Sequence, residues 1–129
     1  MEELRYEKRE LAKVVILNSK NYVLKIEDIA YGGNNLAVIE PKEVLLEAIK
    51  MQANKIILVH NHPSGDPMPS AEDYRLTDRI YEAADILGIQ LLDHIVIGDG
   101  EFESIFRSKI KQKEGYKKIW NFLVLEEKI

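Results

Sequence analysis

The sequence predicts an α/β fold in which helices flank a mixed β-sheet. Short apolar runs with strand character alternate with amphipathic helical stretches from Pro41 onward. The run at residues 55–60 is almost wholly apolar before its final histidine, which is typical of a central strand covered on both faces. The chain has 129 residues, of which 46% are hydrophobic, and this is enough for a single core. We therefore expect one domain over residues 1–129, with its core at about 11–106.

The strands are expected in the order of their apolar runs. A hairpin turn at residues 18–21 joins the first two, and a Gly98-Asp99-Gly100 turn precedes the last. The expected strands are residues 11–17, 22–30, 36–39, 55–60, 89–97 and 102–106.

Two helices are expected between these strands. Pro41 suits a first helical position, and the apolar stripe that follows predicts a helix to about Gln52. Ser70 as an N-cap and Gly88 as a stop signal delimit a second helix. Residues 107–129 are expected to form a basic C-terminal tail or a short amphipathic helix.

The composition restricts the kind of site and the compartment. The absence of cysteine excludes a disulfide framework and thiolate-bound zinc, so ligands must be nitrogen or oxygen atoms. Residues 1–10 are charged rather than signal-like, and no apolar run approaches the length of a membrane span. We expect a soluble, cytoplasmic protein with no membrane partner.

Charge is concentrated in one segment, residues 107–118. Nucleic acid or an acidic partner could bind there, but a solvated face is the commoner explanation for such a segment. The net charge of −4 also disfavours a free-standing DNA-binding protein. The segment contains one acidic residue, Glu114, and the basic residues Arg107, Lys109, Lys111, Lys113, Lys117 and Lys118.

The motif His60-Asn61-His62-Pro63 indicates a metal site. In an extended segment, side chains two residues apart point to the same side, so His60 and His62 can both face one ion. Pro63 favours an extended conformation at His62, which holds that geometry.

Asp73 is the third candidate ligand because helical phasing places it on the buried stripe with Thr77. A buried carboxylate needs a cation or hydrogen-bond donors. A carboxylate at the third helical position beside a Ser70 cap would also explain it, but the two upstream histidines favour a ligand.

Two histidines and one carboxylate leave the fourth position of a zinc ion open, as in catalytic sites. Zinc lowers the pKa of a bound water towards neutrality, and a nearby carboxylate is still needed to take its proton. Glu27, in the second expected strand, is the candidate base. Its neighbour Asp28 must point to the opposite face if that strand is regular.

The motifs around this site resemble two known sequence patterns. His60-x-His62-Pro63, followed by Ser70 and Asp73, is similar to the JAMM (MPN+) metalloprotease motif. The longer string His60-Asn61-His62-Pro63-Ser64-Gly65, then Pro69-Ser70-x-x-Asp73 and Thr77, and later Leu91-Leu92-Asp93-His94-Ile95-Val96-Ile97-Gly98-Asp99-Gly100, resembles the RadC family over roughly residues 11–106.

The resemblance implies a three-layer α/β/α, cytidine-deaminase-like fold with one zinc ion per chain held by His60, His62 and Asp73. It implies a glutamate base on an earlier strand, matched here by Glu27, and a serine that stabilises the tetrahedral intermediate, matched by Ser70. The sequence departs from the family pattern at Gly33 and lacks the helix-hairpin-helix region that often precedes this domain. The family name records a link to DNA repair, but no residue here recognises DNA.

Asp93 and His94 interrupt an apolar strand, with Asp93 expected on the face of Leu91 and Ile95. They could orient a zinc-bound imidazole or tie two strands together, and we favour the structural interpretation.

Three classes of function follow from these residues. We favour a zinc metalloprotease or isopeptidase acting on a peptide or isopeptide amide. The alternatives are a non-catalytic or DNA-repair-associated binding module that keeps the fold and metal, and an iron oxygenase with a facial triad. The ligand order disfavours the oxygenase, and the lack of cysteine ligands disfavours a deaminase.

Overall fold

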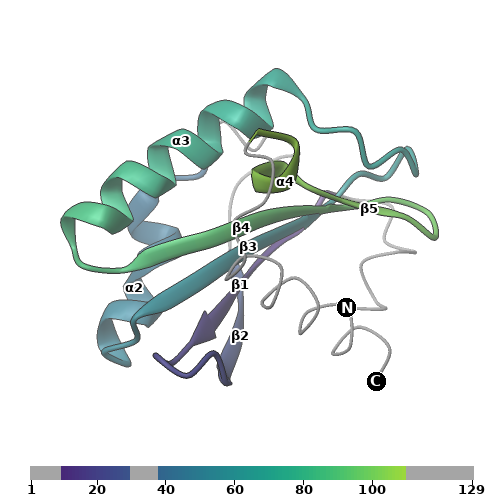
Figure 1. Ribbon diagram of the computed structural model, residues 1–129. Coiled ribbons are helices and arrows are strands. Elements are labelled where there is room, and N and C mark those ends of the chain that lie inside the picture. Colours follow the sequence, from purple (N-terminus) through teal and green to yellow (C-terminus); the bar gives the residue numbers. More distant parts are fainter. Residues whose placement is uncertain (1–9, 30–37, 110–129) are drawn as a thin grey trace.

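A five-stranded mixed sheet forms the centre of the structure, a computed structural model that describes residues 10–29 and 38–109. The strands are β1 (Ala12–Leu17), β2 (Val23–Ile29), β3 (Lys55–Asn61), β4 (Gln90–Ile97) and β5 (Phe102–Ser104). Their order in the sheet is β2-β1-β3-β4-β5 (Figure 1). Only β3 and β4 pair in parallel, and the other neighbours are antiparallel. The predicted α/β class with a mixed sheet is therefore confirmed.

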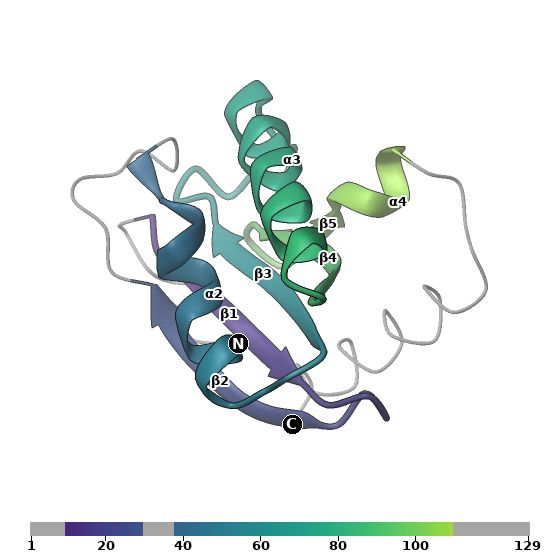
Figure 2. The same ribbon diagram turned by 90° about the vertical axis from the view of Figure 1, so that its left-hand side faces the viewer.

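The helices that the structure describes pack on one face of this sheet. They are α2 (Pro41–Lys50), α3 (Ala71–Ile86) and the short α4 (Ile105–Lys109). Figure 2 shows α2 and α3 side by side in front of the strands. The core between sheet and helices contains Val14, Ile56 and Leu58 from the strands, Val44, Leu45 and Ala48 from α2, and Leu76, Ile80 and Ala84 from α3. Within residues 10–29 and 38–109, no helix combines the length and hydrophobicity needed to cross a bilayer.

The opposite face of the sheet is also apolar and buried. Val15, Ile57 and Val59 on this face are each no more than 1% exposed. None of the described helices lies there, so the second helical layer of the predicted three-layer arrangement is not found among the described residues and stays a prediction.

The segment before α2 differs from the prediction of a strand at residues 36–39. Leu36 and Ala37 lie outside the described residues, and Val38 and Ile39 belong to no strand. Ile39 instead precedes the N-cap Glu40, whose carboxylate and that of Glu43 form a reciprocal capping box. Ile39 and Val44, at the staple positions around this cap, share the same core. A short apolar run can precede a helix as well as form a strand. Here the capping box at Glu40 begins a helix directly after the run.

The predicted strand at residues 102–106 is also only half correct, because β5 ends at Ser104 and α4 begins at Ile105. Ser104 Oγ accepts a hydrogen bond of 3.0 Å from the Arg107 amide, which caps the first turn. Most of the basic segment 107–118, together with Gly33, lies outside the described residues.

Strand β4 contains an irregularity that the sequence pattern does not reveal. The register with β3 shifts between Ile56 and Ile57. Leu91 consequently belongs to the core under the helices and Ile95 to the opposite face. Asp93 pairs with Ile57 and so lies on the face of Ile95. The expectation that Leu91 shares that face is wrong, since strict alternation fails at a bulge.

Candidate metal and active site

The two histidines of the motif leave β3 at its carboxyl end. His60 is the penultimate residue of the strand, and its side chain is 0% exposed on the helix-covered face. Asn61 ends the strand, and His62 begins the loop that leads to α3. Strand alternation thus separates Asn61 from the two imidazoles, as expected.

Asp73 meets these histidines from the first turn of α3. It is the N3 residue of the helix and is 1% exposed. Its amide donates to Ser70 Oγ at 3.1 Å, and its Oδ2 accepts from the Ser70 amide at 2.8 Å. The capping interpretation and the ligand interpretation of Asp73 are therefore compatible, because the cap fixes the carboxylate where it faces both rings.

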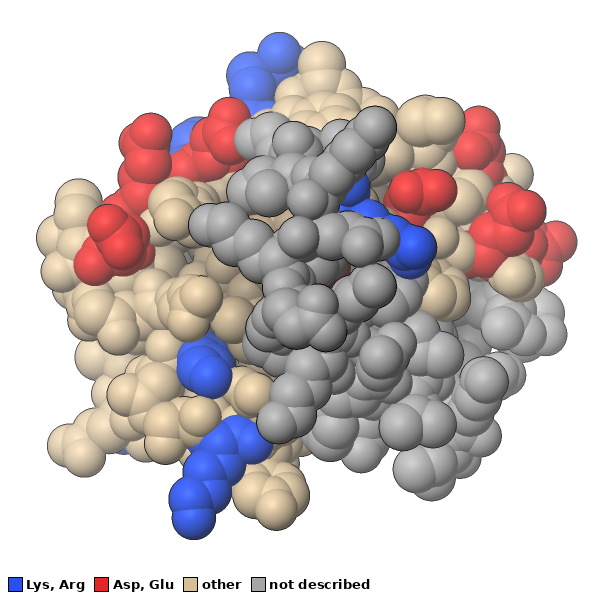
Figure 3. All heavy atoms as spheres, in the orientation of Figure 1, with Lys and Arg blue, Asp and Glu red and all other residues tan. Residues whose placement is uncertain are grey.

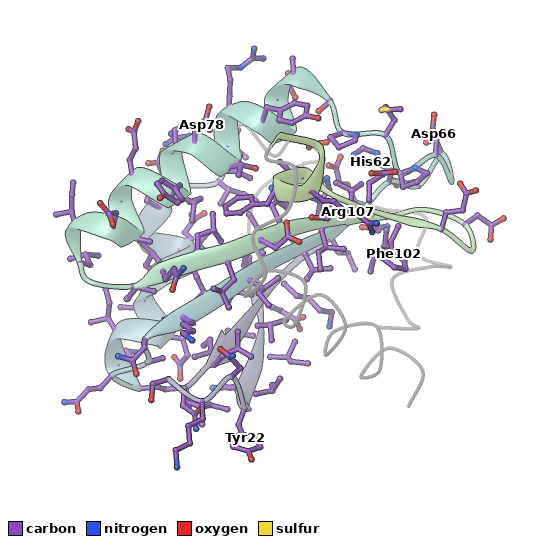
Figure 4. All side chains as sticks on the ribbon, viewed as in Figure 1. Tyr22, His62, Asp66, Asp78, Phe102 and Arg107 are labelled. Carbon is purple, nitrogen blue, oxygen red and sulfur yellow. The ribbon has the colours of Figure 1, made fainter. Side chains whose placement is uncertain are left out.

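Four side chains form a group that could hold a metal ion: Glu10, His60, His62 and Asp73, with one ligand atom from each lying within 4.8 Å of the others. His60 Nε2 lies 3.1 Å from Asp73 Oδ1, and His62 Nε2 lies 3.1 Å from Asp73 Oδ2. The sequence predicted three of these residues to lie together, and the structure brings them together. Figure 4 places His62 and Asp66 at the end of the molecule that also carries Phe102, far from Tyr22.

The donor set fits a small divalent cation. Zinc bonds of about 2.0–2.1 Å in a tetrahedral arrangement place neighbouring ligand atoms about 3.3 Å apart, close to the two 3.1 Å separations. His60 Nε2 is buried and has no hydrogen-bond partner among the described residues. A buried polar atom without a partner is costly, and a cation shared with Asp73 would satisfy it.

The electrostatics of the group favour ligand forms of its members. Burial acts to raise the pKa of Asp73, but the imidazoles of His60 and His62 and the Ser70 amide hold it well below its ordinary value. Burial lowers the pKa of His60, which favours the neutral ring. The hydrogen bond to Asp73 raises the pKa of His62 in the metal-free protein, so metal and proton compete there.

Glu10 is the member of the group that sequence analysis missed. Because β1 runs antiparallel to β3 with Ala12 opposite His60, the residues just before β1 lie beside the histidines. Glu10 Oε1 is 3.9 Å from His60 Nε2, and burial raises the pKa of Glu10. The only sequence signal was a carboxylate directly before an expected strand, which has meaning only once the partner of that strand is known.

Asn61 fixes the segment that carries Glu10. Its Oδ1 accepts from the Leu11 amide at 2.6 Å, and its own amide donates to the Leu11 carbonyl at 3.3 Å. The side chain and the backbone of Asn61 therefore both hold the residue that follows Glu10.

Glu27, the base predicted from the sequence, lies outside the cluster. It lies on edge strand β2 opposite Val14, and Val14 is opposite Leu58. Two strand spacings and two residues along the strand separate it from His60 by about 12 Å between Cα atoms. Its carboxylate instead pairs with Lys25 Nζ at 3.0 Å. Glu27 lies on the correct face of the sheet but too far from the ligands.

The loop from His62 to α3 is held against the β4–β5 turn. The His62 amide donates to the Ile97 carbonyl at 2.8 Å, and the Asp99 amide donates to the Gly65 carbonyl at 2.8 Å. Gly65 has φ +89°, which suits glycine. His62 Nδ1 lies 2.9 Å from the Asp66 carbonyl and so donates to it, leaving Nε2 as the ligand atom.

Ser70 is positioned by its cap, with its side chain at the rim beside Asp73. Its hydroxyl oxygen accepts from the Asp73 amide, and a hydroxyl that accepts can still donate its own proton. The N-cap role is observed, and a role towards a reacting oxyanion stays a prediction.

Asp93 and His94 have different roles. Asp93 accepts from Ser104 Oγ at 2.6 Å and from the His94 amide at 2.7 Å, so it ties β4 to β5 as the structural interpretation expects. His94 Nε2 lies 2.7 Å from His60 Nδ1. The position of His94 fits both interpretations, since this hydrogen bond joins two strands and its partner is the ring of a candidate ligand.

The metal-free protein should become less stable as the pH falls from 7 to 5. Burial lowers the pKa of His60, and it lowers that of His94 well below the usual value, so the unfolded chain binds more protons below roughly pH 6.5. The raised pKa values of His62 and Glu10 act in the opposite sense, but these two groups are only partly buried, whereas His60 and His94 are fully buried. Urea unfolding in the presence of a chelator measures this. A His94→Gln variant should show a weaker dependence, and a midpoint that rises on acidification would contradict the assignment.

The fold and the site together define a class of protein. It is an α/β domain in which His60 and His62 lie at the end of a central strand and in the loop after it, and in which the next helix supplies Asp73 to a cluster that could hold a metal ion. Residues 1–112 match the RadC-like JAB domain family, and the chain belongs to that family.

Curated relatives agree with this assignment. The chain is 51% identical over 105 residues to a UPF0758 protein of Alkaliphilus metalliredigens, covering 81% of this chain and 45% of that protein. It is 55% identical over 100 residues to a UPF0758 protein of Caldanaerobacter subterraneus, covering 78% and 43%. A UPF0758 protein of Clostridium tetani is 50% identical over 105 residues, covering 81% and 46%. The chain thus spans less than half the length of these relatives, whose names state no activity.

Proposed function

We propose that this domain is a zinc-dependent hydrolase that cleaves an amide bond of a peptide or isopeptide. The observation that supports this most strongly is the buried, unpartnered Nε2 of His60, which faces Asp73 beside His62. Membership of the JAB-type family is consistent with a metal-dependent hydrolase.

The residues of the cluster divide into ligands and reacting groups. His60, His62 and Asp73 would hold the zinc, because their ligand atoms are the closest together. A zinc ion at this position would supply Lewis-acid activation of a water molecule and of a carbonyl oxygen.

Glu10 is the proposed base. Glu10 Oε1 lies 3.9 Å from His60 Nε2, whereas the histidine nitrogens lie 3.1 Å from the Asp73 oxygens. This larger distance suits a carboxylate that acts on a water molecule. Its raised pKa brings proton affinity closer to neutral pH, where it can accept a proton and return it to the leaving amine.

Ser70 is proposed to donate its hydroxyl proton to the oxygen on which negative charge develops. Its oxygen accepts from the Asp73 amide, which leaves its own proton available to a second acceptor. A donor prepared in this way stabilises the transition state more than the ground state.

The surface around the site favours a peptide over a nucleic acid. Acidic side chains gather at the end of the molecule that carries the loop after β3 and the β4–β5 turn (Figure 3). Asp66, Asp99 and Glu101 are exposed in these two loops. Phosphate groups would be repelled there, which argues against the alternative of a nucleic-acid-binding module acting through this face.

Metal analysis of the purified protein tests the proposal. We expect about one zinc ion per chain in the native protein and none in His60→Ala. Glu27→Gln is the matched control, since it removes a carboxylate of the same sheet face without touching the cluster, and it should retain zinc. A native protein that binds no zinc under any loading condition would rule out the proposed hydrolase.

A further inference from the structure

A row of buried hydrogen bonds connects α3 to the metal-facing ring through β4. Thr77 Oγ1 lies 2.7 Å from the Asp73 carbonyl oxygen and 2.6 Å from His94 Nδ1. His94 Nε2 lies 2.7 Å from His60 Nδ1. Thr77, His94 and His60 are each no more than 1% exposed, so the row lies away from bulk solvent.

Counting protons favours one of two arrangements along this row. The reverse one, with His60 Nε2 donating to Asp73 Oδ1 at 3.1 Å, would use the Thr77 proton for His94 and leave the 2.7 Å contact between Thr77 Oγ1 and the Asp73 carbonyl without a proton. Two oxygens 2.7 Å apart require a proton between them, and a carbonyl can only accept, so the single hydroxyl proton of Thr77 goes to Asp73. Thr77 Oγ1 must then accept from His94, whose Nδ1 carries the proton. A neutral imidazole has one ring proton, so His94 Nε2 accepts and His60 Nδ1 donates.

The result for His60 is a bare Nε2. Its only proton lies on Nδ1, and the Nε2 lone pair faces Asp73 Oδ1 at 3.1 Å with no hydrogen-bond partner among the described residues. Both rings are 0% exposed, and burial without a counter-ion of its own favours a neutral imidazole for His94.

We propose that His94 and Thr77 are positioning residues that hold His60 as its Nδ1–H tautomer and so present its Nε2 lone pair to a divalent cation. The part of this inference that concerns the cation rests on the proposed function. His62 obtains the same tautomer from a backbone carbonyl, that of Asp66. His60 obtains it from a side chain, which must itself be oriented by a second one.

Thr77 is therefore the residue whose replacement tests the row. Thr77→Val preserves the shape but removes the acceptor for His94 Nδ1–H, which favours moving the His94 proton to Nε2. That nitrogen would then donate to His60 Nδ1, and the His60 proton would move to Nε2, where it competes with a metal ion. Thr77→Ser keeps the hydroxyl and serves as the matched control.

The first measurement is long-range ¹H–¹⁵N NMR of the metal-free protein. We expect His60 to show a protonated, pyrrole-type Nδ1 and a pyridine-type Nε2 in the native protein and in Thr77→Ser. In Thr77→Val the two nitrogens should exchange character, wholly or in part. A native protein with the His60 proton on Nε2 overturns the inference, whatever the variants do.

The second measurement is zinc affinity by competition with a chelator. Thr77→Val should bind zinc about 10–100-fold more weakly than the native protein, and Thr77→Ser should bind nearly as tightly. Equal affinity and an unchanged His60 tautomer in Thr77→Val would also overturn the inference. Far-UV circular dichroism checks that the variant is folded. If it is not, His94→Gln replaces it, since the Gln oxygen can accept from His60 and its amide can donate to Thr77, and zinc binding should survive.

The two proposals fail differently. If the native protein has the inferred tautomer but binds no zinc, the proposed hydrolase is wrong and the tautomer assignment stands. If zinc binds and the tautomer is reversed, the positioning role is wrong and the metal site stands.

Discussion

Glu10→Gln should slow amide hydrolysis strongly while leaving zinc binding intact. The substitution keeps the size of the side chain but removes its capacity to accept a proton, and general base catalysis contributes about 10²–10⁴-fold to rate. We expect a loss of that size in kcat/KM. Glu10 lies 3.9 Å from His60 Nε2, farther than Asp73 does, so the ligand set should survive.

Glu27→Gln is the control for this experiment. It changes the same residue type on the same face of the sheet, but its carboxylate pairs with Lys25 rather than with the cluster. Its activity against a peptide library should equal that of the native protein. Activity that survives in Glu10→Gln and is lost in Glu27→Gln would show that Glu27, and not Glu10, is the base. Loss of zinc in Glu10→Gln would make Glu10 a ligand instead.

Gly98→Ala should displace the loop that carries His62. A Cβ at Gly98 would overlap the Gly65 carbonyl and lie 2.9 Å from Pro67 Cδ, so backbone must move. The Gly65 carbonyl also accepts the Asp99 amide that holds the loop to the β4–β5 turn. We expect a destabilisation of about 1–3 kcal/mol from overpacking, together with weaker zinc binding, because His62 is only three residues from Gly65.

Gly100→Ala separates this clash from backbone strain. Gly100 has φ +71° in the same turn, but a Cβ there would meet nothing within 4 Å. It should cost about 1–2 kcal/mol through its left-handed backbone while zinc affinity stays unchanged. Urea unfolding and chelator competition measure the two effects. Equal zinc affinity in Gly98→Ala and the native protein would show that the contact between Gly98 and Gly65 does not determine the position of His62.

The parts of the site that lie close together in sequence were predictable. His60 and His62 follow from strand alternation, and Asp73 follows from the phase of the helix that begins after Ser70. Each relation is local, because a strand or a helix fixes the direction of its side chains over a few residues.

The parts that depend on strand pairing were not predictable. Glu10 is beside His60 only because β1 lies antiparallel to β3, and no local pattern specifies which strands pair. The same limitation led to Glu27, which has the correct residue type and face but lies on the far side of β1. The bulge in β4, which places His94 against His60, breaks the period of two on which the sequence argument relied.

Asn61, between the two histidines, has a consequence for how the site responds to motion. Alternate residues of an extended chain face opposite directions. His60 and His62 therefore face the cluster, while Asn61 between them holds the Leu11 backbone next to Glu10, the proposed base. A sliding or tilting of β3 would carry Leu11, and Glu10 with it, along with His60. The spacing between Glu10 and the two histidines is thus set by a single short stretch of chain, and we expect movement of the sheet to shift them together.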